Sequence, residues 1–160
     1  DLGSHKEGYK IIDTKLKTVF SNNIRNNFGF LNQAENSDIN SPDKLFIQEG
    51  KKVFKQVIPI VASLIEDHLQ KNNIPIDTVS RLWLHQANLS MNQLIAKKLL
   101  GRDPGAEEMP IVLDEYANTS SAGSIIAFHK YQDDLNMNDI GVICSFGAGY
   151  SVGSIIVQKI

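Results

Sequence analysis

The stretch RLWLHQANLSMNQLIAKKLL, residues 81–100, runs from a short apolar segment through one histidine into an amphipathic helix. Its first four residues have the length and bulk of a buried β-strand. Apolar side chains then recur close to the helical period, with Asn88 or Ser90 available to cap the start of the helix and Gly101 to end it. His85 therefore lies where a strand passes into a helix, and in open α/β sheets ligands bind at the carboxyl ends of the strands.

The composition is that of an ordinary globular domain. The chain has 160 residues, 42% of them hydrophobic, and a formal net charge of -2, which gives no sign of nucleic-acid or membrane binding. We find no signal-peptide pattern and no apolar run long enough to cross a membrane. The single cysteine cannot form an internal disulfide, which favours a reducing compartment, so we expect a cytoplasmic protein.

Residues 1–42 are polar and rich in asparagine, with Tyr9–Ile12 as the only plausible strand. We expect an irregular linker or functional loop here, and a folded domain from 43 to 160. The first residue is Asp1 and not methionine, so we expect a piece of a longer protein or a tagged product.

A helix is predicted to enter at Ser41-Pro42 and to continue to about Lys71, with a kink at Pro59. Beyond the central strand and helix, the pattern predicts a short strand and then a second helix packed through Ile125, Ile126, Phe128 and Tyr131. Two buried strands follow, joined by a glycine-rich hairpin connection. The predicted ranges are Met109–Leu113, Ser120–Leu135, Gly141–Phe146 and Ser151–Ile160. This order predicts an α/β fold in which a mixed β-sheet carries helices on its faces and ends in a C-terminal β-hairpin.

Four histidines are present, and three of them have polar surroundings in the sequence. His5, His68 and His129 are predicted to be solvated surface residues. His85 differs, because a titratable group at the end of an apolar strand needs a partner or a site. It is either a satisfied structural histidine or a functional one.

Asn118 repeats the placement of His85, because it comes shortly after the predicted strand 109–113 and before the next helix. One interpretation is a helix N-cap, a role that asparagine fills well. The other is that the two strands are parallel neighbours, so that the imidazole of His85 and the carboxamide of Asn118 face one crevice.

The glycines Gly147, Gly149 and Gly153 match no phosphate-binding or nucleophile motif in its required context. A dinucleotide-binding loop and a G-x-S-x-G elbow both need a helix after the loop, whereas a strand is predicted here. We expect the glycines to let backbone N–H groups approach a ligand. Cys144 lies in mid-strand and is predicted to be a buried hydrophobe. No ligand spacing for a metal site is found, and no cofactor is expected.

Three motifs together resemble a known family. The segments Trp83–Asn88, Asn118–Ser120 and Phe146–Gly149 resemble, in order and spacing, the C-terminal half of β-ketoacyl-acyl-carrier-protein synthase III and its thiolase-fold relatives. The resemblance extends from about Phe46 to Ile160. It implies one half of a duplicated fold with a Cys-His-Asn site.

In this family the other half supplies a cysteine that is acylated from coenzyme A. The resemblance implies that His85 and Asn118 bind the malonyl thioester oxygen during decarboxylation. A neutral imidazole and a carboxamide NH₂ suit that role, because loss of CO₂ leaves an enolate whose charge needs preorganised donors. Phe146, Gly147, Ala148 and Gly149 would line the site near the acylated cysteine, as substrate-binding residues.

The resemblance also implies partners. These are acyl-coenzyme A and malonyl-acyl-carrier protein as substrates, the acidic carrier protein itself, the N-terminal half, and a homodimer of the full-length enzyme. Lys97 and Lys98 either meet the carrier protein or form the solvated cationic end of a helix. Ser90 stands where related enzymes often carry an arginine for carrier docking, and Tyr116-Ala117 replaces a more usual His-Gly.

Cys144 matches a core position of the family and not the acylated residue, so the chain is expected to be catalytically incomplete alone. The function implied is decarboxylative Claisen condensation of an acyl thioester with a malonyl thioester, in the synthesis of fatty acids or related lipids and polyketides. Two alternatives remain open: acyl transfer on the same fold without decarboxylation, and a binding module with no catalytic role.

Overall fold

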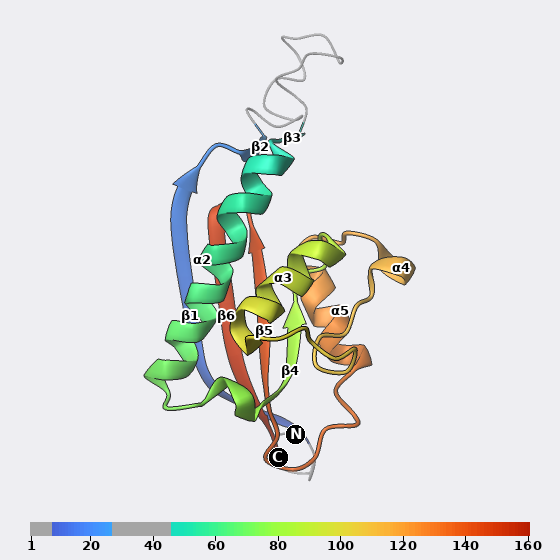
Figure 1. Ribbon diagram of the computed structural model, residues 1–160. Coiled ribbons are helices and arrows are strands. Elements are labelled where there is room, and N and C mark those ends of the chain that lie inside the picture. Colours follow the sequence, from blue (N-terminus) through green and yellow to red (C-terminus); the bar gives the residue numbers. More distant parts are fainter. Residues whose placement is uncertain (1–7, 27–45) are drawn as a thin grey trace, which may run out of the picture.

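A four-stranded mixed sheet carries helices on both faces, in a computed structural model that describes residues 8–26 and 46–160 (Figure 1). The sheet order is β1-β6-β5-β4, and a separate two-stranded sheet pairs β2 with β3. The strands are β1 (Tyr9–Ser21), β2 (Ile24–Asn26), β3 (Phe46–Gln48), β4 (Val79–Leu84), β5 (Ile140–Gly147) and β6 (Gly149–Lys159). The helices are α2 (Gly50–Lys71), α3 (Leu89–Leu100), α4 (Leu113–Tyr116) and α5 (Ala122–Lys130), with a 3-10 turn at Ile76–Thr78.

The strand directions confirm the predicted mixed sheet and C-terminal hairpin. β4 and β5 are parallel, whereas β5 with β6 and β6 with β1 are antiparallel. Leu84 pairs with Cys144 near the carboxyl ends of the two parallel strands. These two strands therefore deliver the residues that follow them to the same edge of the sheet.

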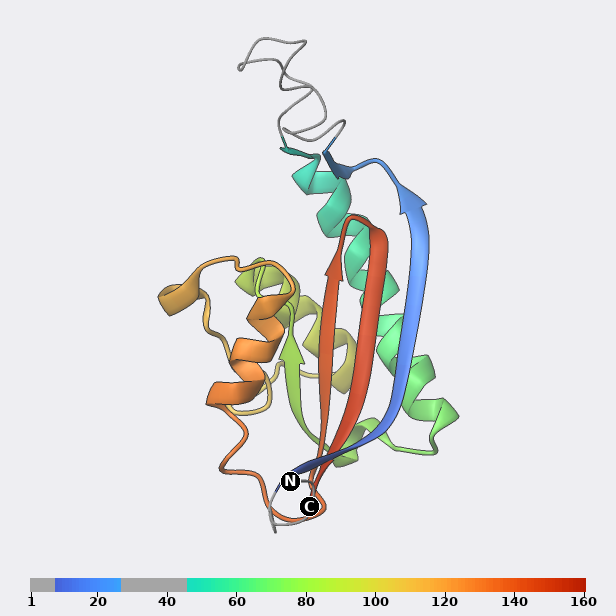
Figure 2. The same cartoon turned by 180° about the vertical axis from the view of Figure 1, so that it is seen from behind.

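Side chains that alternate along the strands divide the core between two faces of the sheet. Leu82 and Leu84 pack into the cluster that contains the buried side chains of α2 and α3, whereas Trp83 packs with residues of α5. Figure 2 shows the arrangement from behind, with α5 covering the β4 end of one face, while none of the described helices lies over β1 and β6 on that side. Leu16 of β1 is accordingly 76% exposed, and Ile125 of α5 is 52% exposed.

The prediction for the opening segment was wrong where the structure describes it. Instead of four extended residues in an irregular segment, β1 has 13 residues and pairs with β6 along most of its length. Its sequence is largely polar because it is an edge strand with little burial, so the strand is made by backbone pairing and not by an apolar pattern. The predicted helix entry at Ser41-Pro42 lies outside the described residues, as does His5.

Three predicted elements were misplaced. Residues 46–48 form β3, so α2 begins at Gly50, although it ends at Lys71 as predicted and continues through Pro59. The predicted strand 109–113 is absent, because Pro110 has no N–H to offer a ladder; one backbone bond, from Leu82 N to Glu108 O at 2.7 Å, joins this segment to β4. The second helix is shorter than expected and ends at Lys130.

His68 was wrongly predicted to be solvated. It is 0% exposed, between α2 and the strands β1 and β6, because β1, which is longer than predicted, lies beside that helix. His129 is exposed, as predicted.

Candidate functional site

His85 and Phe146 meet at the edge where β4 and β5 end. His85 directly follows β4, and Phe146 is the next-to-last residue of β5. Their ring centroids lie 4.7 Å apart with an interplanar angle of 62°, an edge-on contact. The parallel strands thus hold the imidazole against an aromatic wall, and this orients the ring.

The imidazole is buried and favours the neutral form. His85 is 7% exposed, and burial lowers its pKa below the ordinary value of histidine, while the backbone of Ser120 acts in the opposite direction. A neutral imidazole carries one N–H donor and one acceptor nitrogen. The Nδ1 atom is buried without a hydrogen-bond partner in the described part of the chain. A buried polar atom without a partner is unusual in a core residue and typical of a site.

Asn118 lies in the loop between α4 and α5, on the same side as His85. Its Oδ1 accepts a hydrogen bond from the backbone N–H of Ser120 at 2.9 Å, which turns the carboxamide and leaves its NH₂ group available as a donor. The N-cap interpretation is wrong, because the residue at the cap of α5 is Ser121. The loop also holds two non-glycine residues with positive φ, Ala117 at 52° and Ser120 at 58°.

A cavity of about 350 Å³ brings most of the predicted site residues together. His85, Asn118, Phe146, Gly147 and Ala148 all line it. The other lining residues, which sequence reasoning missed, are Ile24, Phe46, Gln48, Val53, Ala87, Met91 and Ser120.

Gly149 does not line this cavity. Its φ of 129° is a conformation open to glycine, and a Cβ at this position would lie 2.9 Å from the backbone nitrogen of Ser151. Gly149 therefore serves the turn between β5 and β6. Ser151 and Gly153 lie within β6, with no helix after them, so the formal nucleophile-elbow match has the wrong context.

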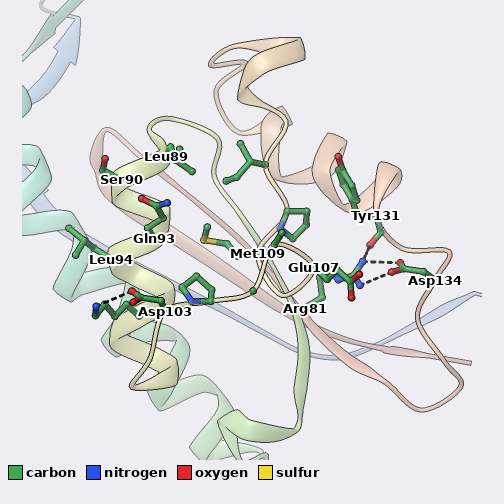
Figure 3. Close-up of a pocket in the computed structure, with 16 residues that line it drawn as sticks. Arg81, Leu89, Ser90, Gln93, Leu94, Asp103, Glu107, Met109, Tyr131 and Asp134 are labelled. Atoms are coloured by element: carbon green, nitrogen blue, oxygen red, sulfur yellow. Dashed lines mark hydrogen bonds and ion pairs between the residues drawn. The ribbon is translucent and has the colours of Figure 1, made fainter.

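A larger cavity, of about 920 Å³, lies on the other side of α3 and does not include His85 or Asn118 (Figure 3). Lys97 lies at its border and pairs with Asp103 at 2.9 Å. Arg81 and Asp134 close the opposite end with two hydrogen bonds of 2.8 Å. Four charged side chains of this cavity are thus paired with one another, whereas His85 Nδ1 in the smaller cavity has no partner among the described residues.

The one cysteine does not line either cavity. Cys144 is fully buried, and burial raises the pKa of its thiol to about 12. No group of three or more metal-ligating side chains occurs within 8–26 and 46–160. Over the same residues, no helix is long and apolar enough to span a membrane.

Comparisons with known proteins identify the family of this chain. Residues 69–159 match the family model described as 3-oxoacyl-[acyl-carrier-protein (ACP)] synthase III C terminal. The chain is 62% identical over 159 residues to a beta-ketodecanoyl-[acyl-carrier-protein] synthase of Pseudomonas aeruginosa, covering 99% of this chain and 45% of that protein. It is 28% identical to a beta-ketoacyl-[acyl-carrier-protein] synthase III of Chlorobaculum tepidum, over 97% of this chain and 48% of the relative.

Solved structures support the fold. The 3-oxoacyl-[acyl-carrier-protein] synthase III of Aquifex aeolicus superposes with a TM-score of 0.76 at 20% identity, covering 94% of this chain and 44% of that one. The chain thus spans about half the length of the proteins it matches. The family model covers more than half of the chain, and the fold is that of a thiolase-type half. This chain therefore belongs to the family of 3-oxoacyl-[acyl-carrier-protein] synthase III C-terminal domains.

Proposed function

We propose that this domain supplies the oxyanion-binding half of a condensing enzyme that joins an acyl thioester to a malonyl thioester with loss of CO₂. The observation that carries the proposal is the shared cavity: His85 and Asn118 line one space, together with Phe146, Gly147 and Ala148. The cysteine that holds the acyl group is assigned to the N-terminal half, because the thiol of Cys144 is buried and strongly protonated.

In the proposed reaction, the bond between the malonyl C2 and its carboxylate breaks and releases CO₂. The electron pair moves into the thioester, giving an enolate whose oxygen accepts hydrogen bonds from the imidazole N–H of His85 and the NH₂ of Asn118. The enolate carbon then attacks the acyl carbon held on cysteine, a carbon–carbon bond forms, and the cysteine thiolate leaves. Preorganised donors of this kind are each worth about 10²–10³ in rate.

Neutral His85 suits this role, because it presents a donor without carrying a proton that must first be lost. Burial keeps its pKa below the ordinary value, so the ring is uncharged at pH 7. The Oδ1 bond to Ser120 fixes Asn118 with its NH₂ as the free end of the amide.

The donor is proposed to be an eight-carbon acyl thioester. The Pseudomonas aeruginosa relative is named a beta-ketodecanoyl synthase. A ten-carbon β-keto product contains two carbons from malonate after CO₂ is lost, which leaves eight for the acyl group. We further propose acyl-coenzyme A as the donor form, malonyl-acyl-carrier protein as the extender, a homodimeric cytoplasmic enzyme, and docking of the carrier protein near Lys97 and Lys98.

The proposal is tested in the full-length enzyme with His85→Ala, Asn118→Ala and, as a control, His129→Ala on the exposed face of α5. We expect each site variant to lose at least about 100-fold in CO₂ release from malonyl thioester. Transfer of the acyl group to cysteine should remain near wild type, and His129→Ala should resemble wild type in both assays. His85→Gln keeps an N–H donor and should retain more activity than His85→Ala.

Wild-type CO₂ release by either alanine variant would contradict the assignment of the donors. Products formed from donors that carry no malonyl group, with no CO₂ released, would point instead to simple acyl transfer. If the full-length protein binds no thioester, the remaining interpretation is a binding module with no catalytic role.

A further inference from the structure

Gln86, the residue after His85, is buried and makes hydrogen bonds that the proposed reaction does not use. Its side chain is 0% exposed and does not line the site cavity. Its Oε1 accepts a hydrogen bond from Val112 N at 3.0 Å, and its Nε2 donates to Leu84 O at 2.9 Å and to Pro110 O at 3.4 Å. One carboxamide thus joins the end of β4 to the segment that leads into α4.

The hydrogen bonds of the Gln86 side chain take the place of backbone bonds that a strand paired with β4 would make. The segment beside β4 contains Pro110, which has no N–H for a ladder. Gln86 supplies both a donor and an acceptor at this place, so the backbone groups of Pro110 and Val112 are satisfied in a buried environment.

Gln86 also contacts the segment on the other side of Asn118. A Cβ on Gly123, in the first turn of α5, would lie 2.7 Å from the Cβ of Gln86 and 3.1 Å from its Cγ. Glycine therefore lets α5 approach the stem of Gln86 directly. Gln86 thus touches the chain before Asn118, at Val112, and after it, at Gly123.

The loop between Val112 and Gly123 has a backbone conformation that its own residues do not favour. Ala117 and Ser120 both have positive φ, which costs free energy in non-glycine residues. Such a conformation persists only where surrounding contacts hold it. Gln86 provides contacts of that kind at both ends of the loop, from the residue next to His85.

We propose that Gln86 is a positioning residue that sets the placement of Asn118 relative to His85, so that both donors reach one enolate oxygen. This rests on the proposed function above. Gln86 acts through the loop and does not touch the substrate. An error of about 1 Å in such a placement costs about 100-fold in rate.

The test compares Gln86→Met with Gln70→Met in the full-length enzyme. Met keeps the length and burial of the side chain but removes all three hydrogen bonds, while Gln70 is exposed on α2 and serves as the matched control. For Gln86→Met we expect kcat for CO₂ release to fall by about 10- to 100-fold, with acylation of cysteine within about twofold of wild type. Gln70→Met should change neither.

A second measurement separates positioning from general damage. On a background of His85→Ala and Asn118→Ala together, Gln86→Met should cost less than about twofold further, because no donors remain to be misplaced. If Gln86→Met does not fold, Gly123→Ala perturbs the same contact from the side of α5 and should reproduce the selective loss of CO₂ release.

Equal losses of acylation and CO₂ release, or no loss of either, would overturn the positioning role. If His85→Ala and Asn118→Ala lose CO₂ release while Gln86→Met and Gly123→Ala do not, this inference fails and the proposed function stands. If the two alanine variants retain CO₂ release, the proposed function itself fails.

Discussion

The Nδ1 atom of His68 lies 3.0 Å from the Oγ atom of Ser154, and this contact joins α2 to β6 below the surface. On the other side of the ring, Nε2 lies 3.4 Å from the carboxylate of Asp13 in β1. The same carboxylate accepts hydrogen bonds from Lys71 at 2.8 Å and Asn72 at 3.0 Å. One buried histidine therefore connects α2 to both β6 and β1.

The stability of the protein should depend on pH through His68. Burial lowers the pKa of His68, as do Lys15 and Lys71, while Asp13 opposes them. Below about pH 6.5 the unfolded chain takes up a proton that the folded chain does not, so the free energy of unfolding should fall as the pH falls. We expect the fall between pH 7 and pH 5 to be smaller in His68→Gln than in wild type, as measured by urea denaturation.

The exposed histidine offers the matched control. His129→Gln makes the same substitution on the exposed face of α5. Parallel curves for wild type and His68→Gln would contradict the prediction. Ser154→Ala, which leaves His68 Nδ1 buried and unpaired, should lower the free energy of unfolding by about 1–3 kcal/mol at pH 7.

Replacement of Ala117 by glycine should stabilise the protein. Ala117 has φ 52° and ψ -154°, a region that is essentially limited to glycine. Relief of this strain outweighs the added freedom of the unfolded chain, so we expect Ala117→Gly to raise the free energy of unfolding by about 1 kcal/mol. Ala122→Gly, at the start of α5, should not stabilise. A drop in the melting temperature of Ala117→Gly would exclude strain at this position.

The stability of the protein should depend on the ion pair between Arg81 and Asp134. Only 5% of the Arg81 side chain is exposed, and it makes two hydrogen bonds to Asp134 and one to the backbone oxygen of Tyr131. Asp134→Ala leaves a buried cation with one partner, and should cost about 2 kcal/mol, since the carboxylate itself is 60% exposed. Asp133→Ala, beside it on the surface, should change stability much less. Equal effects in thermal unfolding would show that the ion pair contributes little.

Cys144 should be unreactive while the protein is folded. Burial raises its pKa to about 12, and it lies in mid-strand with no exposed surface. Iodoacetamide at pH 8 should modify Cys144 only after addition of denaturant, as located by peptide mass spectrometry. Modification of this residue in the native protein within minutes would show that β5 opens far more readily than its packing implies.

The junction of β4 and α3 could be predicted because every local signal agreed. The apolar run ends at His85, Asn88 caps the helix by accepting from Met91 N, and Gly101 ends it at φ 71°. Such signals lie in residues close together in the sequence, so they can be seen without the tertiary structure. The placement of Asn118 in the crevice depended on the family resemblance, since the strand predicted before it does not form.

Burial that depends on distant segments could not be predicted. The charged surroundings of His68 in the sequence indicate solvent, but β1, some fifty-five residues earlier, and β6, some eighty-six residues later, enclose the ring. The cavity wall shows the same limitation: Ile24 lies in the predicted linker, and Phe46 and Gln48 lie in the range predicted to be helical, but all three belong to short strands. In each case the missing information is a pairing between residues far apart in the chain.

Pairing between β1 and β6 has a consequence for the order in which the domain is built. Gly8 and Ile160 exchange two backbone hydrogen bonds, of 3.0 Å and 2.9 Å, so the ends of the described chain lie side by side (Figure 1). In the described sheet β1 pairs with β6, which follows all the other described strands in chain order. This pairing can therefore form only after β6 has been synthesised, so it depends on residues far apart in the chain.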